Sequence, residues 1–207
     1  MSKSNDKAAD KMVRISPLGG IAQPGVYGAE RDGGPGVKLA VRHPRSIVTL
    51  IARKGMSKKL SSALKKHYGV TSPAPGHSSA GKALTLHWAG PEQWFAVAEG
   101  REEGQLYQDL AERLKGLASV SDQSHGRITL SVSGPCARDV LAKGTPVDLH
   151  PTKFGDGRCA VTQMAHVGVH LALVGDDAFE ISLFRGFAVS FWEWLTEMSQ
   201  EFGYEVI

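Results

Sequence analysis

Apolar residues alternate with polar ones in several short segments, and this period of two restricts the chain to folds rich in β-strands. The alternating segments are residues 37–41, 84–88, 128–132, 167–173 and 179–183. Residues 47–51 form a β-branched apolar run typical of a buried strand. Apolar residues recur at helical spacing near residues 60–67, 106–117 and 188–202. Strands and helices therefore share the chain, as in the α+β class.

The order of these segments predicts two similar modules. Each half of the chain runs strand–helix–strands–helix–strand, which is the order of a ferredoxin-like split βαβ unit. We predict an α+β fold of two such modules packed together, each with a sheet covered on one face. Residues 37–122 are expected to form the first module and residues 123–207 the second. Residues 1–36 are expected to form a polar tail followed by an extended Gly/Pro-rich arm.

The arm contains five apolar side chains that no regular element can bury together. They are Ile15, Leu18, Ile21, Val26 and Tyr27, which lie among glycines and prolines. Burial of a large apolar side chain contributes about 1.5–3 kcal/mol, whereas ordering each backbone residue costs about 1–2 kcal/mol. The two terms nearly cancel, so we expect the arm to be mobile in the isolated chain and to lie along a partner protein.

Composition excludes several classes of protein. An apolar content of 42% is sufficient for a core, which excludes wholesale disorder. No stretch approaches eighteen apolar residues, and the first residues lack the apolar run of a secretory signal. Cys136 and Cys159 form no CxxC motif and offer no disulfide framework. A reducing, cytoplasmic location is the simplest expectation.

The charges are unevenly distributed. No Asp or Glu occurs from Gly33 to Pro91. That segment carries ten basic residues: Lys38, Arg42, Arg45, Arg53, Lys54, Lys58, Lys59, Lys65, Lys66 and Lys82. The segment could steer an anionic partner, or it could simply form solvated faces. A nucleic-acid-binding module is an open alternative, although aromatic stacking platforms and a recognisable module are missing.

Two motifs match ligand-binding patterns but fail on context. Residues 76–82 read GHSSAGK, as in a phosphate-binding loop, but Ala83 replaces the required hydroxyl and a strand follows where a helix is needed. His166 and His170 have the spacing of a zinc pair on a helix. On the strand predicted here, four residues span about 13 Å, too far for two ligands of one zinc ion.

The nucleophile motifs also fail. Cys136 follows Pro135 at a predicted helix start, where a small buried residue is commoner than a reactive thiol. Asp122, Ser124 and His125 are triad residue types crowded into four positions, without a nucleophile elbow. No GxGxxG is present. We therefore predict no catalytic, cofactor-binding or metal-binding residue, which is typical of a subunit of a larger enzyme.

Residues 120–203 carry a specific resemblance. The first group of matching stretches is VSDQSHGR at 120–127, SGP at 133–135, ARDVL at 137–141, KG at 143–144, VDLHP at 147–151 and Phe154. The second group is Cys159-Ala160, Thr162, Arg185, Phe187-Ala188, Trp192, Trp194-Leu195 and Phe202-Gly203. In these stretches the chain resembles the gamma subunits of heterotetrameric sarcosine oxidase. One departure is Gly186, where that family often has serine.

The resemblance implies an activity for the whole complex. Such an enzyme demethylates sarcosine to glycine with oxygen, forms hydrogen peroxide and passes the one-carbon unit to tetrahydrofolate. The resemblance places FAD, FMN, NAD and tetrahydrofolate on the partner alpha, beta and delta subunits. It also implies a scaffold similar to the glycine-cleavage T-protein, an aminomethyltransferase with a folate-binding fold.

The chain lacks the residues of the related active sites. A T-protein-like site would need acidic residues in the Gly-containing hairpin, and residues 164–173 read MAHVGVHLAL. The related iron–sulfur-repair branch would show Lys-Gly-Cys-Tyr, unlike Arg158-Cys159-Ala160. We therefore predict a non-catalytic gamma subunit with a structural or assembly role. A stand-alone folate-dependent aminomethyltransferase-like protein is the enzyme alternative.

Overall fold

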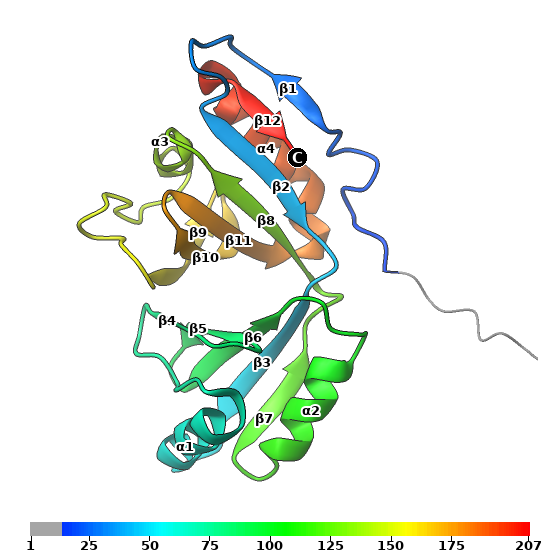
Figure 1. The fold of residues 1–207 in the computed structure, drawn as a ribbon, viewed down its shortest axis with the longest axis vertical. Helices are drawn as coiled ribbons and strands as arrows, with labels where there is room; N and C mark the ends of the chain where they lie inside the picture. The colour runs from blue at the N-terminus through cyan, green and yellow to red at the C-terminus, as the bar shows by residue number, and fades with distance from the viewer. Residues whose placement is uncertain (1–13) are drawn as a thin grey trace, which may run out of the picture.

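The computed structural model describes residues 14–207, which form two sheets lying one above the other (Figure 1). The seven-stranded sheet has the order β1-β12-β2-β8-β11-β10-β9, and the five-stranded sheet has the order β4-β5-β6-β3-β7. The α+β class predicted from the sequence is confirmed.

The five-stranded sheet contains β3 (Ser46–Ala52), β4 (Ser78–Ala80), β5 (Thr85–Gly90), β6 (Gln93–Ala98) and β7 (Ala118–Asp122). Helices α1 (Ser57–Tyr68) and α2 (Gln105–Arg113) cover its outer face (Figure 1). Leu60 and Leu64 of α1 and Leu110 of α2 are buried there because helical spacing aligns them on one face. Gly69 ends α1 with φ 72°, and its N–H donates to the carbonyl of Lys65, as a left-handed cap does.

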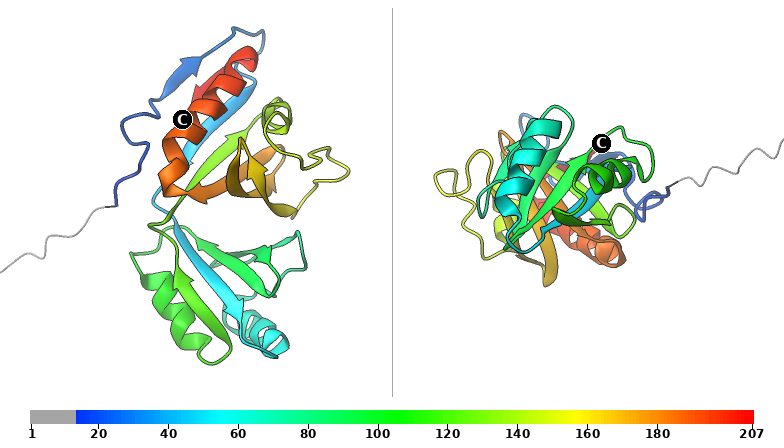
Figure 2. Two further views of the ribbon diagram at one scale, coloured as in Figure 1. Left: turned by 180° about the vertical axis from the view of Figure 1, so that it is seen from behind. Right: turned by 90° about the horizontal axis from the view of Figure 1, so that it is seen from below.

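The seven-stranded sheet contains β1 (Gly25–Tyr27), β2 (Val37–Arg42), β8 (Arg127–Ser133), β9 (Cys159–Met164), β10 (Val167–Gly175), β11 (Ala178–Phe184) and β12 (Tyr204–Val206). Helices α3 (Ala137–Ala142) and α4 (Ala188–Ser199) and the short turns η1 (Arg185–Phe187) and η2 (Gln200–Phe202) accompany it. Figure 2 shows α4 lying along the back of this sheet, where Phe191, Trp192 and Leu195 enter its core. No helix in residues 14–207 is long and apolar enough to cross a membrane.

Strand β2 differs from the sequence prediction. The expected first module begins at residue 37, but β2 lies in the seven-stranded sheet, antiparallel to β8 and parallel to β12. Val37 and Leu39 are buried in the core of that sheet, so the apolar face of β2 is satisfied there. The alternation predicted the strand correctly, but it carries no information about the partner strand. The division of the chain into modules 37–122 and 123–207 stays a prediction.

The arm also differs from the expectation of mobility. Leu18 is fully buried in the core of the seven-stranded sheet. Strand β1 pairs with β12, and the ring of Tyr27 stacks on Tyr204 with centroids 5.3 Å apart. Ile15, Ile21 and Val26 stay exposed. The prediction of a mobile arm is therefore wrong for residues 14–28, because one deep anchor and a strand pairing hold it to the body. The polar tail expected at residues 1–13 lies outside the described residues.

We expect Leu18→Ala to lower the free energy of unfolding of the isolated chain by about 2–3 kcal/mol, since it removes a buried side chain and leaves a cavity. The matched control is Ile15→Ala, whose side chain is 71% exposed. It should change stability by no more than about 0.5 kcal/mol. Urea denaturation of both variants measures the effect. Equal stabilities would show that the arm does not pack on its own body.

Candidate functional site

The two sheets meet through the faces that carry no helix. Along β8, β10 and β11, one set of alternate residues enters the apolar core beside α3 and α4, and the other set points toward the second sheet. Strands β3, β5 and β6 divide their side chains in the same way. The buried polar residues of this shared layer are Thr49, His87, Thr129, His170 and Ser182. This layer is the candidate site, because strands from both sheets contribute polar groups to it.

Two histidines meet in the middle of the layer. His87 of β5 and His170 of β10 are each only 4% exposed, and their ring centroids are 5.2 Å apart. The His170 Nε2 lies 3.1 Å from the carbonyl oxygen of Trp88, so this nitrogen carries the proton and donates. The His87 Nδ1 lies 2.7 Å from the Ser78 hydroxyl. The ring of Phe95 packs edge-on against His170 with centroids 5.4 Å apart.

Both histidines are neutral at physiological pH. Burial lowers the pKa of His87 to about 3, with smaller contributions from His170 and Arg45. Burial likewise lowers the pKa of His170 to about 4, and the nearby Arg127 lowers it further, against a hydrogen bond to Trp88 that raises it. The cause is that a charged ring loses its hydration without gaining a carboxylate partner.

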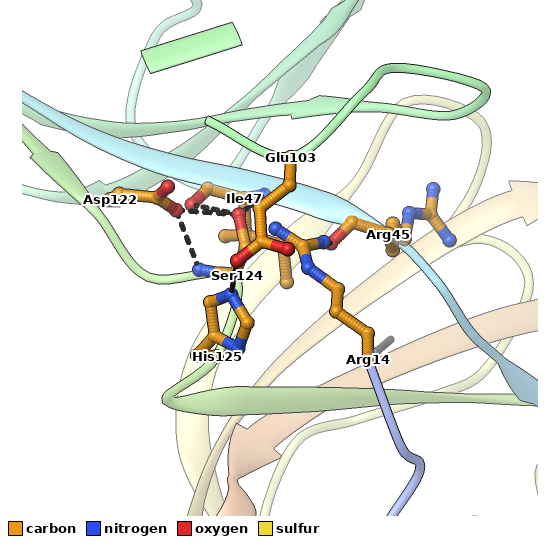
Figure 3. Close-up of polar contacts among 7 residues, drawn as sticks. All are labelled: Arg14, Arg45, Ile47, Glu103, Asp122, Ser124 and His125. Carbon is orange, nitrogen blue, oxygen red and sulfur yellow. Dashed lines mark hydrogen bonds and ion pairs between the residues drawn. The ribbon is translucent and has the colours of Figure 1, made fainter. Parts of the chain in front are cut away.

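An ion pair lies beside the histidines. The guanidinium of Arg45 donates to the carboxylate of Glu180, and both side chains are only 12% exposed. A second carboxylate, that of Glu99, lies 3.8 Å from the Arg45 Nη1. Arg14 of the arm donates to the carbonyl oxygen of Arg45 at 3.1 Å (Figure 3). The arm thus contacts residues 43–45, which connect β2 of one sheet to β3 of the other.

Three cavities follow the layer from one side to the other. One of about 480 Å³ includes Arg42, Lys82 and Glu99 in its lining, and one of about 250 Å³ includes Gln93, Arg127 and Phe184. The space between them is only about 20 Å³, enough for roughly one water molecule. Arg45, Glu180 and His87 separate it from the larger cavity, and Phe95 and His170 separate it from the smaller one. The chain's own side chains therefore fill the centre.

The triad residue types do not assemble into a catalytic relay. The Ser124 hydroxyl lies 2.5 Å from Asp122 and accepts a hydrogen bond from the Ile47 N–H at 3.0 Å (Figure 3). His125 points elsewhere, and its Nε2 lies 2.5 Å from the Glu103 carboxylate. These contacts hold the connection from β7 to β8, the second place where the chain passes from one sheet to the other.

The other residues singled out in the sequence lie apart from one another. Cys136 accepts a hydrogen bond from Arg31 at 2.8 Å, and burial raises the pKa of the Cys159 thiol. His166 is exposed on the turn between β9 and β10, whereas His170 is buried within β10. The loop-like segment 76–82 contains β4 and leads to β5 rather than to a helix. Within residues 14–207, no cluster of three metal-ligating side chains is found.

The basic segment is partly neutralised by acids from elsewhere in the chain. Lys38 pairs with Glu205, and Arg42 pairs with Glu99 at 2.5 Å. Arg45 pairs with Glu180 as described above. The lysines of α1 are all exposed: Lys58, Lys59, Lys65 and Lys66. Folding therefore pairs three of the ten basic residues with acids and leaves exposed the lysines of α1 together with Arg53, Lys54 and Lys82.

Sequence reasoning missed the residues of the central layer. His87 lies between the apolar positions 86 and 88, so the pattern assigned it to a solvent-facing side. The signal that could have identified the layer is in β10, where residues 169–173 are buried on both faces. In the run VHLAL four of the five residues are apolar, which is more than a strand with one solvent-exposed face usually carries.

Two comparisons of the amino-acid sequence with known proteins find relatives of this chain. Residues 55–201 match the family model "Sarcosine oxidase, gamma subunit family". A sarcosine oxidase subunit gamma from Corynebacterium sp. (strain U-96) is 33% identical over 143 residues, which are 68% of this chain and 69% of that protein.

Two solved structures share the fold. A chain of the heterotetrameric sarcosine oxidase from Corynebacterium sp. U-96 superposes with a TM-score of 0.77 at 28% identity, covering 91% of this chain and 96% of that one. The glycine cleavage aminomethyltransferase T from Bartonella henselae gives a TM-score of 0.61 at 19% identity, covering 84% of this chain and 48% of that one. The second likeness concerns the fold alone.

The buried histidines predict that acid destabilises the chain. Folding lowers the pKa of both rings from 6.5, so protons bind preferentially to the unfolded chain. The stabilisation is fully present above about pH 6.5 and is lost as the pH falls toward 4. We expect a loss of roughly 1–2 kcal/mol per histidine between about pH 7 and pH 5.

The measurement is urea denaturation of the isolated chain at both pH values. The double variant His87→Gln/His170→Gln should show a flatter pH dependence than the wild type. His166→Gln, at an exposed position, should keep the wild-type dependence. If the double variant loses as much stability on acidification as the wild type, the layer does not hold two neutral histidines.

Proposed function

The chain belongs to the sarcosine oxidase gamma subunit family, and we propose that within the complex it is a non-catalytic subunit with a structural or assembly role. The enzyme of which it is part is a sarcosine oxidase, an oxidoreductase whose activity belongs to the complex. The observation that carries the proposal is the superposition that covers 96% of a chain of the heterotetrameric enzyme. Such coverage means that the whole body of this chain, and not one motif, resembles a known subunit.

The proposed complex uses chemistry that this chain does not supply. Its reaction converts sarcosine to glycine with oxygen, gives hydrogen peroxide and passes the one-carbon unit to tetrahydrofolate. We propose that FAD, FMN, NAD and tetrahydrofolate are bound by the alpha, beta and delta subunits, in the cytoplasm. We assign no catalytic, cofactor-binding or metal-binding residue to this chain.

Folate is the one group that the T-protein-like scaffold implies, and the residues present do not fit it. The central space between the sheets is about 20 Å³, below the 300–1,000 Å³ of typical ligand sites, whereas the adjoining cavity beside Arg42, Lys82 and Glu99 reaches about 480 Å³. His87, His170 and Phe95 occupy that position and are buried. The hairpin of β9 and β10 has no carboxylate at residues 164–173 that could bind a folate amine. The filled centre supports a subunit that retains the scaffold without the site.

Neither alternative function gains support from a specific contact. A stand-alone aminomethyltransferase would need an open centre, which the histidines and Phe95 close. Of the basic residues that a nucleic-acid-binding module would use, Lys38, Arg42 and Arg45 are paired with acids. The lysines of α1 remain a face that could attract an acidic partner.

Co-expression with the flavoprotein subunits of the same host tests the proposal. A tag on this chain should retrieve the flavoprotein subunits with a flavin spectrum and sarcosine-dependent peroxide formation. The chain expressed alone should be colourless and should bind no tetrahydrofolate in calorimetry. Retrieval of the chain alone from the co-expressing cells would contradict the subunit role. Micromolar binding of tetrahydrofolate by the isolated chain would instead support the aminomethyltransferase alternative.

A further inference from the structure

Arg127, at the start of β8, is a half-buried cation without a counter-charge. Its guanidinium carbon lies 4.6 Å from the ring centroid of Phe95 and 4.4 Å from that of Phe184. These two rings come from different sheets, so they hold the guanidinium between them. Its Nε is buried and has no hydrogen-bond partner, and within residues 14–207 no carboxylate pairs with it.

Two other partly buried arginines have acidic partners. Arg45 pairs with Glu180 inside the same layer, and Arg138 pairs with Asp177 at 2.5 Å. A cation removed from water is costly unless it is paired, and stacking on aromatic rings offsets only part of this cost. Arg14 and Arg158 also have a buried Nε without a hydrogen-bond partner and pair with no carboxylate within residues 14–207. Arg127 additionally lies between two aromatic rings and lines a cavity, where a charge from outside the chain could reach it.

The surroundings of Arg127 form a recess that could admit such a charge. It is the cavity of about 250 Å³ described above, and no acidic residue lines it. Gln93 and His170 are the other polar side chains at its wall, and the Gln93 amide can donate a hydrogen bond. Val161 and Phe184 make the rest of the wall apolar. The volume accepts a side chain or a small acid, but not a large cofactor.

The rim of the recess indicates which kind of acid it takes. Val161 is 54% exposed and Phe184 is 51% exposed. Phe187 and Val189, close behind Phe184 in the chain, are also exposed. A free small acid would leave these apolar side chains in water, whereas a protein surface that inserts an acidic side chain would cover them. An arginine in an apolar pocket is also typical of the residues that dominate binding energy at interfaces.

We propose that the Arg127 recess receives an aspartate or glutamate side chain from a partner subunit, with the exposed Val161 and Phe184 packed against apolar residues beside it. The carboxylate would accept the guanidinium N–H groups that project into the recess, in the bidentate geometry that arginine favours. The inference rests on the proposed function as a subunit and adds to it a contact surface and the chemistry of its partner.

The test uses the co-expressed complex and two substitutions of Arg127. Arg127→Gln keeps a polar side chain without the charge, and it should raise the dissociation constant of this chain from the complex at least tenfold. Arg127→Lys keeps the charge but loses the planar fork, so its effect should be intermediate. The matched control is Arg53→Gln, an exposed arginine between β3 and α1 and outside the recess, which should bind like the wild type.

Melting of each isolated variant separates binding from folding. Since Arg127 has no acidic partner within the described chain, Arg127→Gln loses only the stacking on Phe95 and Phe184 and should melt close to the wild type. If it does not fold, Val161→Ser/Phe184→Ser tests the same recess through two exposed rim positions, and it too should weaken the complex. Unchanged affinity in whichever of these variants folds would overturn the inference. An equal loss in Arg53→Gln would overturn it as well.

A titration with small acids distinguishes a partner side chain from a free ligand. The isolated wild-type chain is titrated with sodium acetate and sodium benzoate. Binding that disappears in Arg127→Gln, together with an unchanged complex, would assign the recess to a free small acid and overturn the partner contact. A wild-type chain that never enters the complex would refute the proposed function, and this inference with it. Normal assembly of the wild type combined with normal assembly of Arg127→Gln would refute the inference alone.

Discussion

The packing of the two sheets through a buried polar layer is the constraint on which the rest of the structure depends. Each sheet buries its apolar face under its own helices. The residues at the alternate strand positions face the other sheet, and several of them are polar. Some of those groups have partners within the chain, above all Arg45 with Glu180 and His170 with the Trp88 carbonyl, whereas the buried Ser182 hydroxyl has none. Neutral His87 and His170 fill the remaining space. The ion pair and the two rings therefore join the sheets and close the centre at the same time.

The sequence predicted the local structure well because local structure depends on side-chain spacing. Strand periodicity, the apolar faces of α1 and α4 and the cap at Gly69 are all visible in neighbouring residues. The pairing of β2 with β8 and β12 is not, because it is decided by residues about 90 and 165 positions further along the chain. The burial of Leu18 was missed for the same reason, because it packs in a core formed by residues far along the chain.

The candidate site was harder to predict than the fold. Polar residues such as Glu180 and Thr129 occupy alternate strand positions, which in sequence look like a solvent-facing side. Only the contact between sheets reveals that this side is buried. The missing counter-charge of Arg127 is likewise visible only when distant residues are placed around it. The resemblance at residues 120–203 identified the family, while the geometry locates the features through which a member of it could act.

We propose that this chain, whose centre is filled by its own side chains, acts through its surface. Amide hydrogen exchange, compared between the isolated chain and the assembled complex, tests this claim most directly. We expect new protection at the end of β11 and in η1, around residues 184–187, and unchanged exchange in the centres of β5 and β10. Protection that appears in β5 and β10 on addition of tetrahydrofolate to the isolated chain, with none at residues 184–187 on assembly, would contradict it.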